Sequence, residues 1–137
     1  MSITDTAVAF FDACEAGKGW GVCKAWCHDG AGFSCQADAL ADVNMLEGYV
    51  GWAASLLTPM PDIHPEVKSV GTDEERNIVS IIATIHGTHT GEGGPVAATG
   101  KAAAGDYVYV LQFDGDKIKG MTKIWNDGFT LRQLGWV

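Results

Sequence analysis

Two side chains that can transfer a proton near neutral pH follow apolar segments in the second half of the chain. Asp127 comes after the apolar run that ends at Trp125, and His89 comes after a β-branched run that begins at Ile78. A carboxylate in apolar surroundings has its charged form disfavoured, so it can serve as an acid or a base near neutral pH. Asp127 and His89 are therefore candidates for general acid–base chemistry on a bound small molecule.

Each candidate also has a purely structural interpretation. Asp127 precedes a short segment of helical character, residues 128–134, and Asp is a favoured helix N-cap. His86 and His89 are three residues apart, so on a strand they point to opposite faces and should not chelate one metal ion. We favour His89 as the histidine that faces the interior, because it lies next to the glycine-rich segment 91–100. The alternative is a histidine that only bonds neighbouring backbone groups.

The cysteines offer a partial metal-binding set, in Cys23, Cys27 and His28. Structural zinc normally takes four ligands in closely spaced pairs. No second pair exists here, because Cys14 and Cys35 stand alone. The sequence therefore predicts free thiols and no metal. No Ser-His-Asp order or Cys-His nucleophile pattern is found, which argues against hydrolysis through a covalent intermediate.

The composition limits the partners of the protein. The 137 residues are 47% hydrophobic and carry a net charge of −8, with no cluster of Lys or Arg. Binding to nucleic acid or to an anionic membrane is disfavoured without a basic surface. The first residues lack the basic start and apolar run of a secretory signal, and no window approaches the roughly 18 apolar residues that cross a bilayer. We expect one cytoplasmic domain over residues 1–137, a common size for a single domain.

Helical spacing dominates the first part of the chain. Ser2 begins a capping-box pattern for a first helix that ends before Gly17, and a short second helix ends at Gly30. Asn44 is expected to cap a third helix, which Pro59 prevents from continuing.

Period-two alternation follows in the later part of the chain. Strands are expected over residues 33–36, 63–70, 78–90, 106–113 and 117–125, with a short helical turn over 127–134. Helices followed by a meander of strands indicate the α+β class. We expect a cone-shaped, curved antiparallel sheet with the three N-terminal helices packed on its concave face. Such a cone encloses a ligand pocket.

Short motifs in the second half of the chain carry a family resemblance. They are GTHTG at 87–91, TGK at 99–101, QFDGDKI at 112–118, WND at 125–127 and QLG at 133–135. As a set they resemble the SnoaL-like polyketide cyclases, which belong to the nuclear-transport-factor-like superfamily together with ketosteroid isomerase and scytalone dehydratase. The order of the expected helices and strands matches that family over essentially the whole chain.

The resemblance implies a cone-shaped α+β fold, usually dimeric, with a deep pocket and no cofactor. In the cyclases an Asp near the end of the last strand is the acid/base for an intramolecular aldol closure, and its counterpart here is Asp127. Counting back from the QLG motif places the same position on Asn126. A shift of one residue on a strand turns the side chain to the other face, so Asn126 and Asp127 are alternatives for the position inside the cone.

Aromatic residues are expected in the wall of the pocket, because Tyr and Trp combine an apolar body with a polar tip. We expect Trp52, Tyr109 and Trp125 there, with Asn126 beside them. The predicted function is a cyclase- or isomerase-type enzyme that applies acid–base chemistry to an apolar carbonyl compound. The alternative is a non-catalytic binding module for a hydrophobic small molecule. The run 78–85 is apolar on both faces, so its outer face predicts a homodimer.

Overall fold

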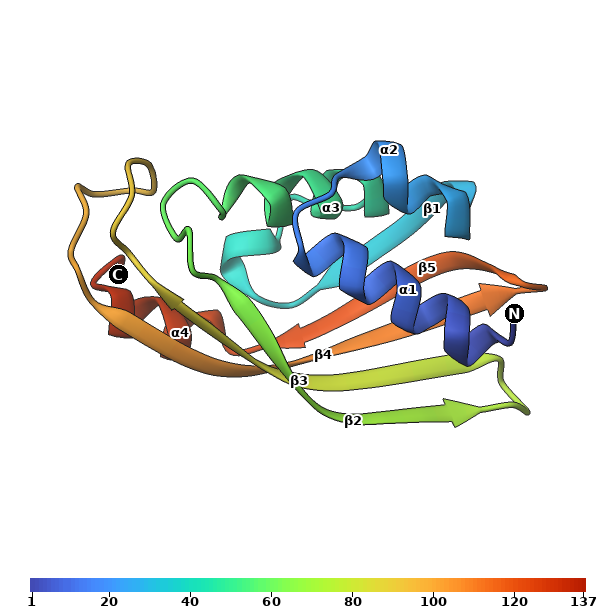
Figure 1. The fold of residues 1–137 in the computed structure, drawn as a ribbon. Helices are drawn as coiled ribbons and strands as arrows, with labels where there is room; N and C mark the ends of the chain where they lie inside the picture. Colours follow the sequence, from blue (N-terminus) through green and yellow to red (C-terminus); the bar gives the residue numbers. More distant parts are fainter.

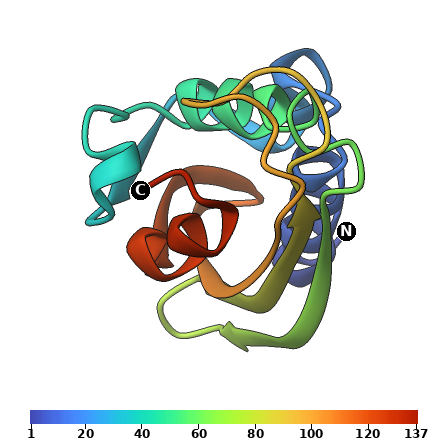
Figure 2. The ribbon, with the colours of Figure 1, turned by 90° about the vertical axis from the view of Figure 1, so that its left-hand side faces the viewer.

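The protein is described over Met1–Val137 by a computed structural model, and its centre is one five-stranded sheet. The strands are β1 (Cys27–Cys35), β2 (His64–Asp73), β3 (Ile78–Thr88), β4 (Ala102–Asp114) and β5 (Lys117–Trp125). They lie side by side in the order β1-β5-β4-β3-β2. The sheet curls strongly, and one end of the curl surrounds the C-terminal helix (Figure 2). The predicted α+β class and curved sheet are confirmed.

One strand pair differs from the expected antiparallel sheet. The meander from β2 to β5 is antiparallel throughout, whereas β1 runs parallel to β5. Successive strands of the meander are joined by connections that reverse the chain. The long stretch between β1 and β5 imposes no such reversal, so β1 can add to the edge in either direction.

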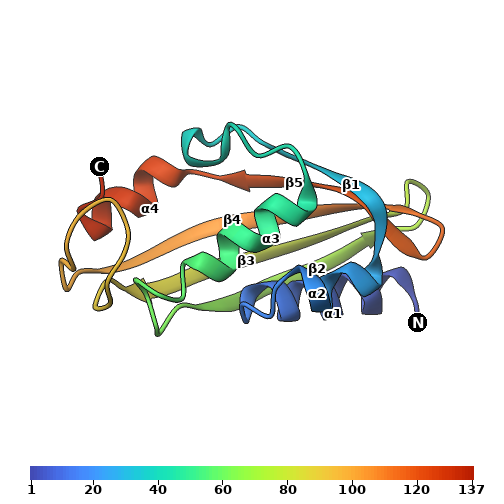
Figure 3. The same ribbon diagram turned by 90° about the horizontal axis from the view of Figure 1, so that it is seen from above.

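Three of the helices form a layer over the sheet (Figure 1), and the fourth, at the C-terminus, lies within its curl (Figure 2). They are α1 (Ile3–Glu15), α2 (Trp20–Cys23), α3 (Leu46–Ser55) and α4 (Asp127–Leu134). The predicted capping box of α1 is present, since the Ser2 hydroxyl accepts from the Asp5 amide and the Asp5 carboxylate accepts from the Ser2 amide. Seen from above, α1 runs along the β2 side of the sheet and α3 crosses its middle, while α4 lies at the far end (Figure 3). None of these helices is long and apolar enough to cross a membrane.

Two helix boundaries were predicted wrongly. The second helix ends at Cys23 and, after a short 3-10 turn, β1 already begins at Cys27, because Cys27 pairs with Ile118 of β5. The third helix begins at Leu46 with Met45 as its N-cap, so Asn44 does not cap it. The Asn44 carbonyl instead accepts from the Phe33 amide, which ties this segment to β1. Both differences arise from pairing with strands that the local sequence does not reveal.

The hydrophobic core occupies the closed part of the cone, between α1, α3 and the concave face of the sheet. Phe10 and Phe11 of α1 are almost fully buried and pack their rings against Tyr109. A smaller cluster of Met60, Ala103 and Leu134 holds α4 to the sheet at the other end. The space between these two clusters is not filled by side chains, and a pocket results.

Candidate functional site

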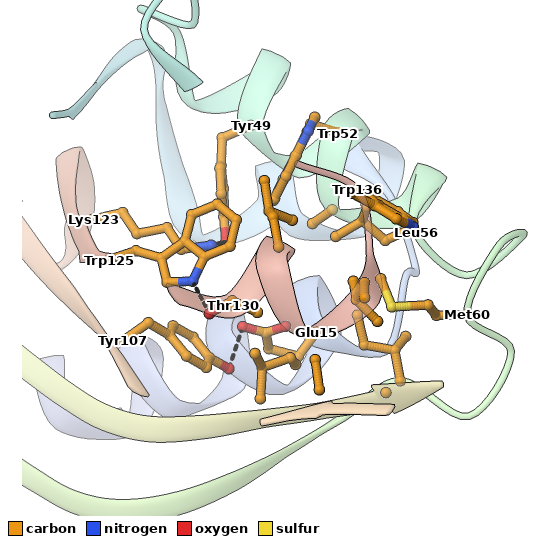
Figure 4. Close-up of a pocket in the computed structure, with 17 residues that line it drawn as sticks. Glu15, Tyr49, Trp52, Leu56, Met60, Tyr107, Lys123, Trp125, Thr130 and Trp136 are labelled. Atoms are coloured by element: carbon orange, nitrogen blue, oxygen red, sulfur yellow. Dashed lines mark hydrogen bonds between the residues drawn. The ribbon is translucent and has the colours of Figure 1, made fainter. Parts of the chain in front are cut away.

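The pocket lies between α3, α4 and the concave face of β3, β4 and β5 (Figure 4). Its cavity volume is about 60 Å³, or about 700 Å³ when the open space at its mouth is counted, and 13 of its 17 lining residues are hydrophobic. Trp52 of α3 and Leu56, the C-cap of that helix, form one wall, and Leu131 of α4 and Trp136 form another. An apolar cleft with a few converging polar groups is the usual form of a small-molecule site.

Glu15, the last residue of α1, brings a carboxyl group to this pocket. It follows Phe11 by one helical turn and so lies on the same inward face of the helix. The Tyr107 hydroxyl donates to Oε1 of Glu15 over 2.7 Å (Figure 4). Burial raises the pKa of Glu15, while the charge of Lys123 and the hydroxyl groups of Tyr107 and Tyr109 oppose the rise. The carboxyl group is therefore ready to exchange a proton closer to neutral pH than an exposed glutamate.

Lys123 of β5 brings an amine to the same pocket. Its inward direction follows from strand alternation, because Met121 and Trp125 face the same way. Only 6% of Lys123 is exposed, and Nζ donates to the Tyr49 hydroxyl over 3.0 Å. The pKa of Lys123 falls to about 8, mainly because burial disfavours the charged form, and the Glu15 carboxylate partly opposes this fall.

Aromatic rings surround the amine of Lys123. Their centroids lie 4.5 to 5.1 Å from Nζ, and they belong to Tyr49, Trp52, Tyr107 and Trp125. Ring faces attract a cation, so the cage partly replaces the water that the ammonium group has lost.

Two tyrosines extend from the amine toward the carboxyl group. The hydroxyls of Tyr49 and Tyr109 lie 2.9 Å apart, and the Tyr109 hydroxyl is close enough to Glu15 to help lower the pKa of the carboxyl group. Burial raises the pKa of both phenols, so they stay protonated and can donate. The result is a hydrogen-bonded path from Lys123 through Tyr49 to Tyr109, with Glu15 beside it and bonded to Tyr107, in a site that can both accept and supply protons.

The aromatic residues predicted for the wall lie in this region. Trp52 and Trp125 line the pocket, with their rings edge to face at 5.8 Å. Trp125 is held in place by Thr130, whose hydroxyl accepts from Nε1 over 3.0 Å. Tyr109 does not line the pocket; it is fully buried behind it, within the hydrogen-bonded path.

Asn126 and Asp127 both lie at the start of α4 and are not among the lining residues. Asn126 is the N-cap, and its Oδ1 accepts from the Phe129 amide over 3.1 Å. Asp127 is the first residue of the helix, and its carboxylate accepts from the Ala39 amide over 2.9 Å. The structural interpretation made Asp127 the helix cap, but the cap is Asn126, one residue earlier. The Asn126 carbonyl already accepts the first hydrogen bond of the helix, from the Thr130 amide.

His89 is fully buried, and both of its ring nitrogens have partners. Nε2 donates to the Gly93 carbonyl over 3.0 Å, which leaves Nδ1 to accept from Trp136 Nε1 at 2.9 Å and from the Thr99 amide at 3.4 Å. His89 therefore lies behind Trp136, outside the pocket lining, and joins that wall residue to the loop 91–100. It does not meet Asp127 in the pocket.

Glu15, Lys123, Tyr49 and Tyr107 were not among the predicted site residues. Two sequence signals could have found the charged pair. Glu15 continues the buried stripe of a helix, one turn after Phe11, and Lys123 interrupts the inward face of an otherwise apolar strand. A charged residue on the buried face of a helix or strand is uncommon without a partner. Two such residues in one chain therefore predict that they share a site.

The fold and its pocket place the protein among the cone-shaped α+β proteins with a ketosteroid isomerase-like architecture. More specifically, residues 8–134 match the SnoaL-like polyketide cyclases, and the chain belongs to this family. No curated protein shows significant similarity to the chain.

Solved structures from several bacteria share the fold. AclR, a candidate hydroxylase from Streptomyces galilaeus, is 22% identical with a TM-score of 0.77, covering 98% of this chain and 96% of its own. IdmH, a candidate polyketide cyclase from Streptomyces antibioticus, is 18% identical with a TM-score of 0.80, covering 98% and 99%. A protein with a ketosteroid isomerase-like fold from Catenulispora acidiphila is 17% identical with a TM-score of 0.70, covering 95% and 92%. At these identities the likeness establishes the fold.

Proposed function

We propose that the protein is a cofactor-independent enzyme of the cyclase or isomerase type, which transfers a proton to or from a small apolar carbonyl compound. The observation that carries the proposal is the presence of a half-buried carboxyl group, Glu15, and a buried amine, Lys123, in one apolar pocket. Environments that push the pKa values of two groups toward neutrality are typical of acid–base sites.

The roles follow from the chemistry of the groups. The Glu15 carboxylate removes a proton from the carbon next to the carbonyl group, and negative charge develops on the carbonyl oxygen. The Lys123 ammonium group is the donor that stabilises this oxygen. Glu15 then returns the proton, either to another carbon, as in an isomerase, or after the enolate carbon has attacked a second carbonyl, as in an aldol cyclase. Family membership supports a substrate with several carbonyl groups.

Deuterium exchange tests this proposal for several classes of ketone at once. The protein is incubated in heavy water with a panel of apolar aryl ketones and cyclic diketones, and mass spectrometry follows the loss of the acidic C–H hydrogens. We expect enzyme-dependent exchange for at least one class of ketone. Ketones that bind, as detected by a rise in melting temperature, yet never exchange would contradict the proposal.

That second result is the behaviour of a binding module, the alternative function. It is favoured by one observation: the Glu15 carboxylate already accepts from a tyrosine at 2.7 Å, and a carboxylate with satisfied lone pairs is a weaker base. The pair Asp127 and His89, predicted from the sequence, is the alternative assignment of the catalytic residues, and variants of both residues decide between the assignments.

We also propose that the protein forms a homodimer through the outer face of the sheet. Ile82, Val108 and Ile124 stand in register across β3, β4 and β5, and Ile82 and Ile124 are 42% and 59% exposed. A row of apolar side chains on an open sheet face favours association. Light scattering should therefore report a dimer that Ile124→Lys dissociates. A wild-type monomer at micromolar concentration contradicts this.

A further inference from the structure

Lys123 has surroundings that no other lysine of the chain has. Every other lysine is exposed to solvent, whereas Lys123 is 6% exposed and lines an apolar pocket. It forms no ion pair with any carboxylate, and its one hydrogen-bond partner is the uncharged hydroxyl of Tyr49. In a buried amine without a direct counter-ion, the charged ammonium form is disfavoured relative to the neutral amine.

We propose that Lys123 Nζ is a nucleophile, which condenses with the carbonyl carbon of an aldehyde or ketone bound in the pocket and forms an imine. The inference rests on the proposed function for one point only, that the pocket receives a carbonyl compound. Its chemistry goes further, because the amine then bonds to the carbonyl carbon and no longer acts only as a donor to the oxygen.

The condensation balances without any co-reactant. The nitrogen lone pair forms a C–N bond while the C=O π electrons move to the oxygen, which takes up a proton as the nitrogen loses one. The hydroxyl group, protonated once more, then leaves as water while the nitrogen lone pair forms the C=N bond, and the resulting iminium nitrogen releases its remaining proton to give the imine. One carbonyl compound and one amine give one imine and one water, with no oxidation or reduction.

The surroundings of Nζ supply what these steps need. Tyr49 lies at hydrogen-bond distance from the amine and bonds in turn to Tyr109, and the Glu15 carboxyl group lines the same pocket, so a proton donor and acceptor are available beside the nitrogen. The pocket is mostly apolar, and limited access of water favours a step that releases water. A proton held on Glu15 can leave with the hydroxyl group.

Titratable groups face Nζ from four other elements. They are Cys14 and Glu15 on α1, Tyr49 on α3, Tyr107 on β4 and, one strand over, Cys35 on β1. Burial outweighs them and lowers the pKa of Lys123 to about 8. The free amine therefore becomes the main form above this pH, whereas an exposed lysine remains charged to about 10.4.

Reductive trapping tests the inference on the intact protein. Benzaldehyde is the probe, because it is apolar and has no hydrogen next to its carbonyl group, so the reaction stops at the imine. Cyanoborohydride then fixes the adduct, intact mass gives the stoichiometry and peptide mapping gives the site. We expect one adduct, at Lys123, with labelling that rises through about pH 8. Labelling spread over the exposed lysines without preference for Lys123 would overturn the inference.

Two variants complete the test. Lys123→Arg keeps a positive charge and donors but cannot form an imine, so the single adduct should be lost; Lys117→Arg removes an exposed lysine and should leave it intact. The outcome is separable from that of the proposed function. If wild type exchanges deuterium but is not trapped at Lys123, only the imine fails. If it is trapped at Lys123 but exchanges nothing, the imine stands and the proposed acid–base function fails.

Discussion

Two regions of the molecule hold unusual polar side chains, and they differ in what those side chains bind. At the open end, His89, Asn126 and Asp127 bond mainly to backbone groups: a carbonyl and an amide for His89, and amides for the other two. In the pocket, Glu15 and Lys123 bond to hydroxyl groups of tyrosines. Side chains that satisfy the backbone hold loops and helix ends in place. Side chains that bond to other titratable groups can themselves gain or lose a proton.

The largest difference between the regions should appear in catalysis. Glu15→Gln removes the proton-transferring group but keeps its size, and we expect deuterium exchange of an active ketone to fall roughly 100- to 10,000-fold. Asp127→Asn is the matched change in the other region and should leave the exchange rate unaltered. The reverse result, with exchange lost in Asp127→Asn and kept in Glu15→Gln, would restore the assignment made from the sequence.

Stability should rise when the charged residues of the pocket are replaced, although catalysis should fall. Burying charged groups costs free energy that their mutual attraction need not repay, so the double variant Glu15→Gln/Lys123→Met should be more stable than wild type by about 1–4 kcal/mol. Urea denaturation measures the free energy of unfolding. A double variant that is clearly less stable would mean that the pair serves the fold.

At the open end, removal of a polar side chain should instead destabilise the protein. His89→Ala leaves the Trp136 indole N–H and the Gly93 carbonyl without a partner, and unsatisfied buried groups cost about 1–3 kcal/mol. The same denaturation experiment reports this loss. We also expect the protease sensitivity of the loop 91–100 to increase, since His89 holds it through Gly93 and Thr99; a loop as resistant as in wild type would argue against this role.

The smallest effect concerns the start of α4. Asn126→Ala removes the bond to the Phe129 amide, and loss of an N-cap typically costs about 1 kcal/mol. The deuterium exchange rate should not change, because Asn126 is not a lining residue. A thermal melt of this variant beside Asn126→Asp, which retains a capping oxygen, separates loss of the cap from any other cause.

Local patterns predicted the elements whose stability is local. The strand 117–125 and the helix 127–134 have the predicted boundaries, and the first helix has its predicted cap. The parallel position of β1 and the start of α3 were not predictable in this way, because both depend on bonds between segments distant in the sequence, such as Cys27 with Ile118.

The pocket was harder to predict than the fold. Glu15 lies near the beginning of the chain and Lys123 near its end, and only the curl of the sheet brings the last turn of α1 to the inward face of β5. The family motif drew attention to Asn126 and Asp127 instead, where a difference of one position decides which residue caps a helix. A search for charged residues in the buried phase of each element would have selected Glu15 and Lys123 directly.

The parallel edge strand has a consequence for the amine of Lys123. Because β1 adds beside β5, Lys123 belongs to an interior strand, with Cys35 opposite it on one side and Tyr109 on the other. Its main chain is thus held between two neighbouring strands, and Nζ can move only by rotation about the side-chain bonds. Folding therefore already restricts the position of the amine, and a substrate that binds in the pocket does not have to order it.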